Sequence, residues 1–203
     1  MNSNTVFVTS EIRWFSSSDK ILRSEFEACS EYGNIFDQSP RTDTYLDSKV
    51  KNTGIKFREG SFEIKVKSGP DRSWRYGQIE RWIKWSIDEN LDLMSEIDEK
   101  VSQDWIPVWK KRSMMVFEWV GDNELRSTKE ESPRSGCTLE FTEIRLGTAQ
   151  KTIYTLGLEA FHHDGLSGKI LDDALKNLYV EWARLEDLPS YGYPEMLMKE
   201  NKF

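Results

Sequence analysis

Cysteine is scarce in this chain, with only two residues among 203. Cys29 and Cys137 lie far apart and in no spacing typical of metal ligands, so we expect free thiols in a reducing, cytoplasmic compartment. No stretch of about 18 apolar residues is present, so no segment is expected to span a membrane, and the opening residues predict no signal peptide. Glycine-rich phosphate loops and the GxSxG and HExxH patterns are absent as well, so these motifs identify no catalytic residue.

The chain also lacks the excess of basic residues that nucleic-acid binding usually requires, because its net charge is −7. A local group of cations in an acidic protein instead favours a small, highly charged anion as the ligand. Hydrophobic residues make up a modest 37% of the chain, but 12% aromatic residues, including eight tryptophans, can supply a core. The length predicts a single domain over residues 1–203, with an irregular tail from about residue 187.

Residues 54–67 predict a β-hairpin, and the rest of the chain is interpreted around it. Apolar and charged residues alternate along both halves, which is the period-2 pattern of paired strands. Glu59 and Gly60 form the turn, because glycine readily takes the positive φ that a two-residue loop needs. The resulting register places all the charged side chains on one face. These charged residues are Lys56, Arg58, Glu63, Lys65 and Lys67.

The order of the other expected elements predicts an α+β fold built on an antiparallel sheet. Alternating patterns predict further strands near residues 5–15, 43–47, 78–86 and 110–120, and a second hairpin over 137–161. Apolar stripes predict helices near 19–31, 88–101 and 168–186, and residues 121–135 read as an exposed loop. The strands follow one another too closely for repeated βαβ units. We therefore expect an antiparallel β-barrel or a strongly curled, tunnel-like sheet with the helices packed outside.

The charges on these strands leave two structural alternatives open. In an open sheet they form an ordinary solvated face and indicate no site. In a closed sheet with the charged face inward, the interior holds many cations and a few carboxylates, which is costly without a polyanion or ordered water. Such an interior suits a polyphosphate, because lysine and arginine neutralise its oxygens while carboxylates hold a bridging divalent metal. The pattern by itself does not choose between the two.

The order of elements and charges resembles the CYTH superfamily, the triphosphate tunnel metalloenzymes that include thiamine triphosphatase and class IV adenylate cyclases. Members open with a strand bearing Glu-x-Glu-x-Lys, followed by a helix, a Tyr/Phe-Asp strand, a basic hairpin and late strands that carry glutamates. Here Glu11-Ile-Arg13-Trp-Phe15 stands in the opening position and Tyr45-Leu-Asp47 in the second, ahead of the hairpin at 54–67. The later positions are filled by Lys111-Arg112, Glu140 and Glu159, so the resemblance covers about residues 5–185.

This resemblance implies a set of phosphate ligands and a set of metal ligands. The expected phosphate ligands are Arg13, Lys56, Arg58, Lys65, Lys67, Lys111 and Arg112. The expected ligands of Mg²⁺ or Mn²⁺ are Glu11, Glu63, Glu140 and Glu159. The opening signature is degenerate, because Arg13 stands where the family has its second glutamate and Phe15 where it has its lysine. No catalytic residue follows from the pattern.

Two classes of function are compatible with these residues. One is a CYTH-like protein that binds a small molecule with a tri- or polyphosphate group and hydrolyses it with a divalent metal. The other is a catalytically degenerate CYTH-like module that binds a phosphorylated ligand, or serves in interaction, without hydrolase activity. Neither class implies a nucleic-acid or membrane partner. A protein without any anion site corresponds to the open-sheet alternative.

Overall fold

A computed structural model of the chain describes residues 5–87, 104–121, 124–130, 133–147, 151–163 and 165–200. The strands are β1 (Thr5–Ser16), β2 (Ile35–Asp37), β3 (Arg41–Leu46), β4 (Thr53–Arg58), β5 (Ser61–Lys67), β6 (Arg72–Trp74), β7 (Gly77–Ile87), β8 (Trp105–Gly121), β9 (Glu124–Ser127), β10 (Ser135–Leu146) and β11 (Thr152–His162). The helices are α1 (Lys20–Ala28), α4 (Ser167–Asn177) and α5 (Tyr193–Glu200), with 3₁₀ helices η1 (Cys29–Glu31) and η2 (Trp182–Leu185). The helix expected near 88–101 lies outside the described residues.

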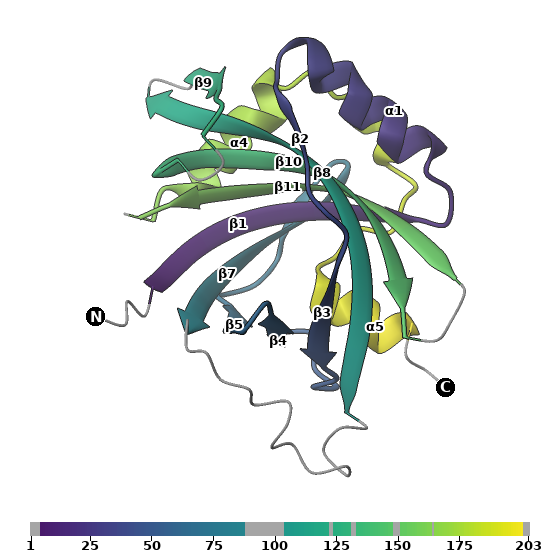
Figure 1. The fold of residues 1–203 in the computed structure, drawn as a ribbon. Helices are drawn as coiled ribbons and strands as arrows, with labels where there is room; N and C mark the ends of the chain where they lie inside the picture. Colours follow the sequence, from purple (N-terminus) through teal and green to yellow (C-terminus); the bar gives the residue numbers. More distant parts are fainter. Residues whose placement is uncertain are drawn as a thin grey trace.

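The described strands form one antiparallel sheet that curls strongly (Figure 1). Its order is β1-β11-β10-β8-β3-β4-β5-β7-β6, and β7 also pairs with β1, so the pairings return to the first strand. β2 and β9 pair with β8 beside this path. The expectation of a strongly curled antiparallel sheet is confirmed. The expectation of a loop over 121–135 is wrong for β9, where Leu125 packs against the core and the backbone pairs with β8.

The hairpin of β4 and β5 has the register that the sequence predicted. Lys56 pairs with Glu63, and Phe57 pairs with Phe62. Glu59 and Gly60 between the strands have φ values of 49° and 84°. Positive φ at both central residues is the requirement of a type I′ turn, whose twist matches that of the strands it joins. The charged residues of this hairpin therefore lie on one face and its apolar residues on the other.

The main apolar core lies outside the curl, where α1 and α4 cover the sheet (Figure 1). Leu22 and Phe26 of α1 and Ile170 of α4 are buried in this core. Trp14 of β1 is also fully buried, stacks on Trp182 with 5.4 Å between ring centroids, and donates its Nε1–H to a backbone carbonyl. Each such aromatic buries a large apolar area, about 150–250 Å². The aromatic residues thus compensate for the modest hydrophobic content of the chain.

The C-terminal segment does not follow the prediction of an irregular tail, because Tyr193–Glu200 forms α5. Tyr193, Met196 and Leu197 have the i, i+3, i+4 spacing of a helical face. They are buried in a second core together with Phe15 and Tyr45 of the sheet. α5 lies under the curl, on the side opposite α1 and α4 (Figure 1). The expectation that all helices pack outside is therefore wrong for α5.

The helix expected over 168–186 is also shorter than its apolar stripe. α4 ends at Asn177, because Leu178 takes an extended conformation with ψ 141°. The Nε1–H of Trp182 donates to the Leu175 carbonyl at 2.9 Å, which satisfies one of the carbonyls left free at the helix end. Trp182 and Leu185 are buried in the main core from η2 instead. The stripe predicted burial correctly, but it did not reveal the break.

Candidate functional site

The inner face of the sheet encloses a cavity of about 100 Å³, called here the central chamber. Residues two apart on a strand share a face, so alternate residues of neighbouring strands reach the same space. Its charged lining residues are Glu11, Arg13, Lys56, Arg58, Glu63, Lys65, Lys84, Lys110, Arg112, Glu140 and Glu159. Among the described residues, seven cations therefore face four carboxylates in one small volume.

Most of the residues that the sequence singled out meet in this chamber. The expected phosphate ligands that line it are Arg13, Lys56, Arg58, Lys65 and Arg112, and all four expected metal ligands, Glu11, Glu63, Glu140 and Glu159, line it too. Lys67 does not line the chamber. Its Nζ lies 2.8 Å from an Asp71 oxygen and 2.9 Å from a Glu80 oxygen, so two carboxylates already hold this ammonium.

The placement of Lys111 corrects the prediction for β8. Lys111 is exposed, whereas Lys110 and Arg112 line the chamber. Adjacent residues on a strand face opposite sides, so Lys111 and Arg112 cannot both point inward. The sequence pattern missed Lys110, although its spacing of two from Arg112 is a signal for a shared face. Lys84, opposite Lys65 in the β5–β7 register, was missed in the same way.

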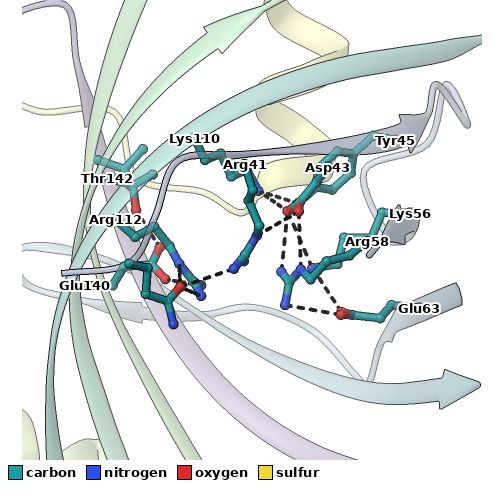
Figure 2. Close-up of polar contacts among 12 residues, drawn as sticks. Arg41, Asp43, Tyr45, Lys56, Arg58, Glu63, Lys110, Arg112, Glu140 and Thr142 are labelled. Atoms are coloured by element: carbon teal, nitrogen blue, oxygen red, sulfur yellow. Dashed lines mark hydrogen bonds and ion pairs between the residues drawn. The ribbon is translucent and has the colours of Figure 1, made fainter. Parts of the chain in front are cut away.

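Asp43 of β3 is the centre of one charge cluster beside the chamber, and sequence reasoning did not identify it (Figure 2). Its carboxylate is fully buried and accepts hydrogen bonds from Lys110 at 3.1 Å and from Arg41 at 3.0 Å. Arg58 approaches at 3.3 Å, and the Lys56 ammonium lies 3.9 Å away. Burial alone would raise the pKa of Asp43, but these cations hold it well below its usual range. The single carboxylate of Asp43 is thus the shared counter-charge of four cations.

The pKa values of the two lysines of this cluster are lowered even though each lysine contacts a carboxylate. Burial, with a smaller contribution from Arg58 and against the attraction of Asp43, lowers the pKa of Lys110 to about 7. Burial and the neighbouring Arg58 also lower the pKa of Lys56 well below its ordinary value. A buried ammonium loses its hydration, and a second cation beside it repels the proton further. For these two lysines, the neighbouring carboxylates do not fully offset the effect of burial on the pKa.

Glu140 and Glu63, two further carboxylates of the lining, are each held by more than one cation. Glu140 accepts a hydrogen bond from Arg13 at 2.9 Å. It also accepts from Arg112 and from the Thr142 hydroxyl, each at 2.8 Å (Figure 2). Although burial opposes ionisation, Arg112 and Arg13 keep the pKa of Glu140 far below its ordinary value.

Glu63 forms a similar group on the hairpin. Its carboxylate lies 2.9 Å from Lys56, 3.2 Å from Arg58 and 3.4 Å from Lys84. Burial works against its ionisation, but the three cations lower the pKa of Glu63 to about 2. Glu11 of β1 accepts from Lys65 at 2.8 Å. Three of the four expected metal ligands are therefore engaged with lysine or arginine.

The donor set does not fit a divalent metal in this arrangement. Within the described ranges, no three His, Cys, Asp or Glu side chains gather closely enough to hold a metal ion. Mg²⁺ requires oxygen ligands in near-ideal octahedral geometry, and ammonium and guanidinium groups supply none. The expectation of bound Mg²⁺ or Mn²⁺ stays a prediction that these contacts do not support.

A second and larger cavity, of about 530 Å³, adjoins the central chamber. The two share part of their lining, including Arg13, Arg112 and Glu140. Its further lining residues are Phe7, Gln38, Met114, Pro133, Arg134, Thr138, Gly157, Phe161 and His163. The charged chamber is therefore continuous with a roomier space whose walls are partly apolar and aromatic.

A scan against models of known protein families finds no match for this chain, and a search of curated proteins finds none either. The resemblance to CYTH proteins thus rests on the residues and element order given above. In the part of the chain that the structure describes, no helix combines the length and the apolar character needed to cross a membrane.

Proposed function

We propose that this chain binds a small molecule with a tri- or polyphosphate group in the central chamber. The excess of seven cations over four carboxylates in the chamber lining carries this proposal. Each of these cations has a carboxylate partner, but burying cations is costly even when they are paired, and a multiply charged anion would stabilise them further. Phosphate oxygens accept charge-assisted hydrogen bonds from lysine and from the two-pronged guanidinium of arginine. The neighbouring cavity of about 530 Å³ offers space into which the organic part of such a ligand can extend from the phosphates.

A divergent CYTH-like, tunnel-type fold is the architecture that we infer for this site. Support comes from the ring of strand pairings, in which β7 returns to β1, and from the inward direction of the charged residues. The alternative of a solvated open face is disfavoured, because Glu11, Arg13, Lys110 and Glu140 are all buried. The buried free thiols Cys29 and Cys137 support a reducing, cytoplasmic location.

Between the two functional classes, the contacts favour binding over hydrolysis. The carboxylates that a metal would need are held by lysine and arginine, as Glu140 is by Arg13 and Arg112. Metal-dependent hydrolysis is the competing function. Orthophosphate release from inorganic triphosphate with Mg²⁺ or Mn²⁺, lost on Glu11→Ala, would establish that competitor.

Calorimetric titration with inorganic triphosphate tests the proposal directly. We expect triphosphate to bind at least about a hundredfold more tightly than orthophosphate, because each additional phosphate adds charge-assisted contacts of about 1.5–3 kcal/mol. Sulfate serves as a control for nonspecific attraction by surface cations. Equal affinities for the three anions would show that the chamber does not recognise a phosphate chain.

Binding should also take up protons. Burial lowers the pKa of Lys110 to about 7, and a bound polyanion would raise the pKa of that ammonium again. Between the free and the bound pKa, the complex holds more protons than the free protein, so affinity should fall as the pH rises above about 7. Titrations in buffers of different ionisation enthalpy measure this uptake.

The Lys110→Met variant is the control for the source of the proton. We expect it to take up fewer protons than the wild type on binding triphosphate. An uptake that is the same in both proteins would contradict the assignment to Lys110.

A further inference from the structure

Arg13 occupies an unusual position at the wall of the central chamber. Its side chain is buried on the inner face of β1, and its NH1 donates to Glu140 and to the Thr155 hydroxyl, each at 2.9 Å. Its guanidinium also lies over the ring of Tyr193, 4.7 Å from the centroid. Burial disfavours the charge, but Glu140 raises the pKa of Arg13 above its already high ordinary value. This guanidinium is a permanent, fixed charge.

The neighbouring strand leaves space for this guanidinium. Gly157 of β11 is the register partner of Arg13 on one side and of Glu140 on the other. A Cβ at position 157 would lie 2.6 Å from Arg13 Cζ, well inside any allowed contact. Gly157 is not among the glycines with positive φ, so its backbone conformation does not require glycine. The close approach of Arg13 explains this glycine.

Two carboxylates lie within the field of this charge. Glu140 is directly bonded to Arg13. Burial would raise the pKa of Glu11, but Lys65, followed by Arg13, holds it below its ordinary value. A divalent cation placed between these carboxylates would have to displace a buried guanidinium from its hydrogen bonds. The guanidinium already provides the positive charge that keeps both carboxylates ionised.

We propose that Arg13 takes the place of a divalent metal ion, so that the central chamber binds its phosphorylated anion without metal. The inference rests on the proposed anion site for its ligand. It assigns Arg13 as a positioning residue, which holds Glu140 through its NH1 atom, while the other cations of the chamber contact phosphate. It predicts that removing or displacing this guanidinium makes the site responsive to metal.

The wild type should bind inorganic triphosphate in EDTA, and Mg²⁺ should not strengthen this binding. In the absence of triphosphate, Mn²⁺ should not bind the wild type, as measured by electron paramagnetic resonance of the free ion. In Arg13→Gln, which leaves Glu11 and Glu140 without this cation, triphosphate affinity in EDTA should fall at least about tenfold, and Mn²⁺ should restore it. Arg13→Lys should retain most of the metal-free binding, because it keeps the charge.

A second variant displaces Arg13 without changing any charge. Gly157→Ala places a Cβ against the guanidinium. Like Arg13→Gln, it should weaken the binding of triphosphate in EDTA. Gly168→Ala is its matched control, since the added Cβ meets only the Ser10 hydroxyl at 3.8 Å. We expect that control to bind triphosphate like the wild type. Far-ultraviolet circular dichroism establishes that each variant is folded before its affinity is compared.

The outcomes separate this inference from the proposed function. Wild-type binding of triphosphate that requires Mg²⁺, or Mn²⁺ binding by the wild type alone, would overturn the role of Arg13 while leaving the anion site in place. A failure of triphosphate to bind under any condition would overturn the proposed function. In that case, Mn²⁺ binding by Arg13→Gln but not by the wild type would still support the inference that the guanidinium takes the place of a metal ion. A failure of Arg13→Gln to bind Mn²⁺ would overturn that inference.

Discussion

Asparagine in place of Asp43 is expected to lower the free energy of unfolding by about 3–5 kcal/mol, the usual cost of removing one partner from a buried charge cluster. The carboxylate of Asp43 is fully buried and lies within 4 Å of cationic nitrogens on Arg41, Lys56, Arg58 and Lys110. Asparagine keeps the shape but leaves these cations without their shared counter-charge. Denaturant unfolding of both proteins, at the same pH and salt, measures the difference.

Asp172→Asn is the matched control for this substitution. Asp172 also pairs with an arginine, Arg72, but the side chains of Arg72 and Asp172 are 53% and 39% exposed. Exposed pairs contribute about 0–1 kcal/mol, so the control should stay within that range of the wild type. A loss at Asp43 no larger than the loss at Asp172 would show that the chamber cations do not depend on Asp43.

The same variant also links stability to the proposed ligand. Removing Asp43 takes away one negative charge near the chamber, so triphosphate should bind the variant more tightly. A ligand that binds only the native state stabilises it in proportion to the logarithm of its saturation. Added triphosphate should therefore narrow the stability difference between Asp43→Asn and the wild type. A stability difference that widens with triphosphate would contradict the proposal that triphosphate binds among these cations.

Replacing Arg58 and Lys65 together with alanine should weaken triphosphate binding at least about a hundredfold. Each charge-assisted hydrogen bond is worth about 1.5–3 kcal/mol, and 1.4 kcal/mol corresponds to a factor of ten. The loss is increased because Glu11 and Glu63, which these cations now engage, would face the phosphate uncompensated. Calorimetric titration in EDTA measures the affinity.

A second double variant controls for the loss of two positive charges. Arg126 and Lys151 each pair with a glutamate, as Arg58 and Lys65 do, but both are exposed and lie outside the chamber lining. Arg126→Ala with Lys151→Ala should leave triphosphate affinity within about threefold of the wild type, since exposed charges are screened by salt. Similar losses in the two double variants would indicate a general field effect rather than a chamber.

The hairpin of β4 and β5 illustrates how much of the site could be predicted from local pattern. Its register and turn, and the shared face of Lys56, Arg58 and Lys65, follow from strict alternation around Glu59-Gly60. Lys110 could have been found by the same parity, because it lies two residues from Arg112. Asp43 could not be separated in this way from the other acidic residues. Its role depends on four cations, three of which, Lys56, Arg58 and Lys110, lie on other strands.

The sequence by itself determined the alternating faces of the strands, the antiparallel sheet, the apolar stripes of α1 and α4, and the cations of the basic hairpin. These are local properties, set by a side-chain period of two or 3.6 residues. The tertiary structure alone decided that β7 pairs with β1 and that the charged face lies inside. It decided as well that Trp182 and Leu185 are buried from a separate 3₁₀ helix, η2, and that α5 lies under the curl. It also decided that Arg13 rests between Glu140 and Gly157. Each of these depends on contacts between distant segments, for which a single strand or helix carries no periodic signal.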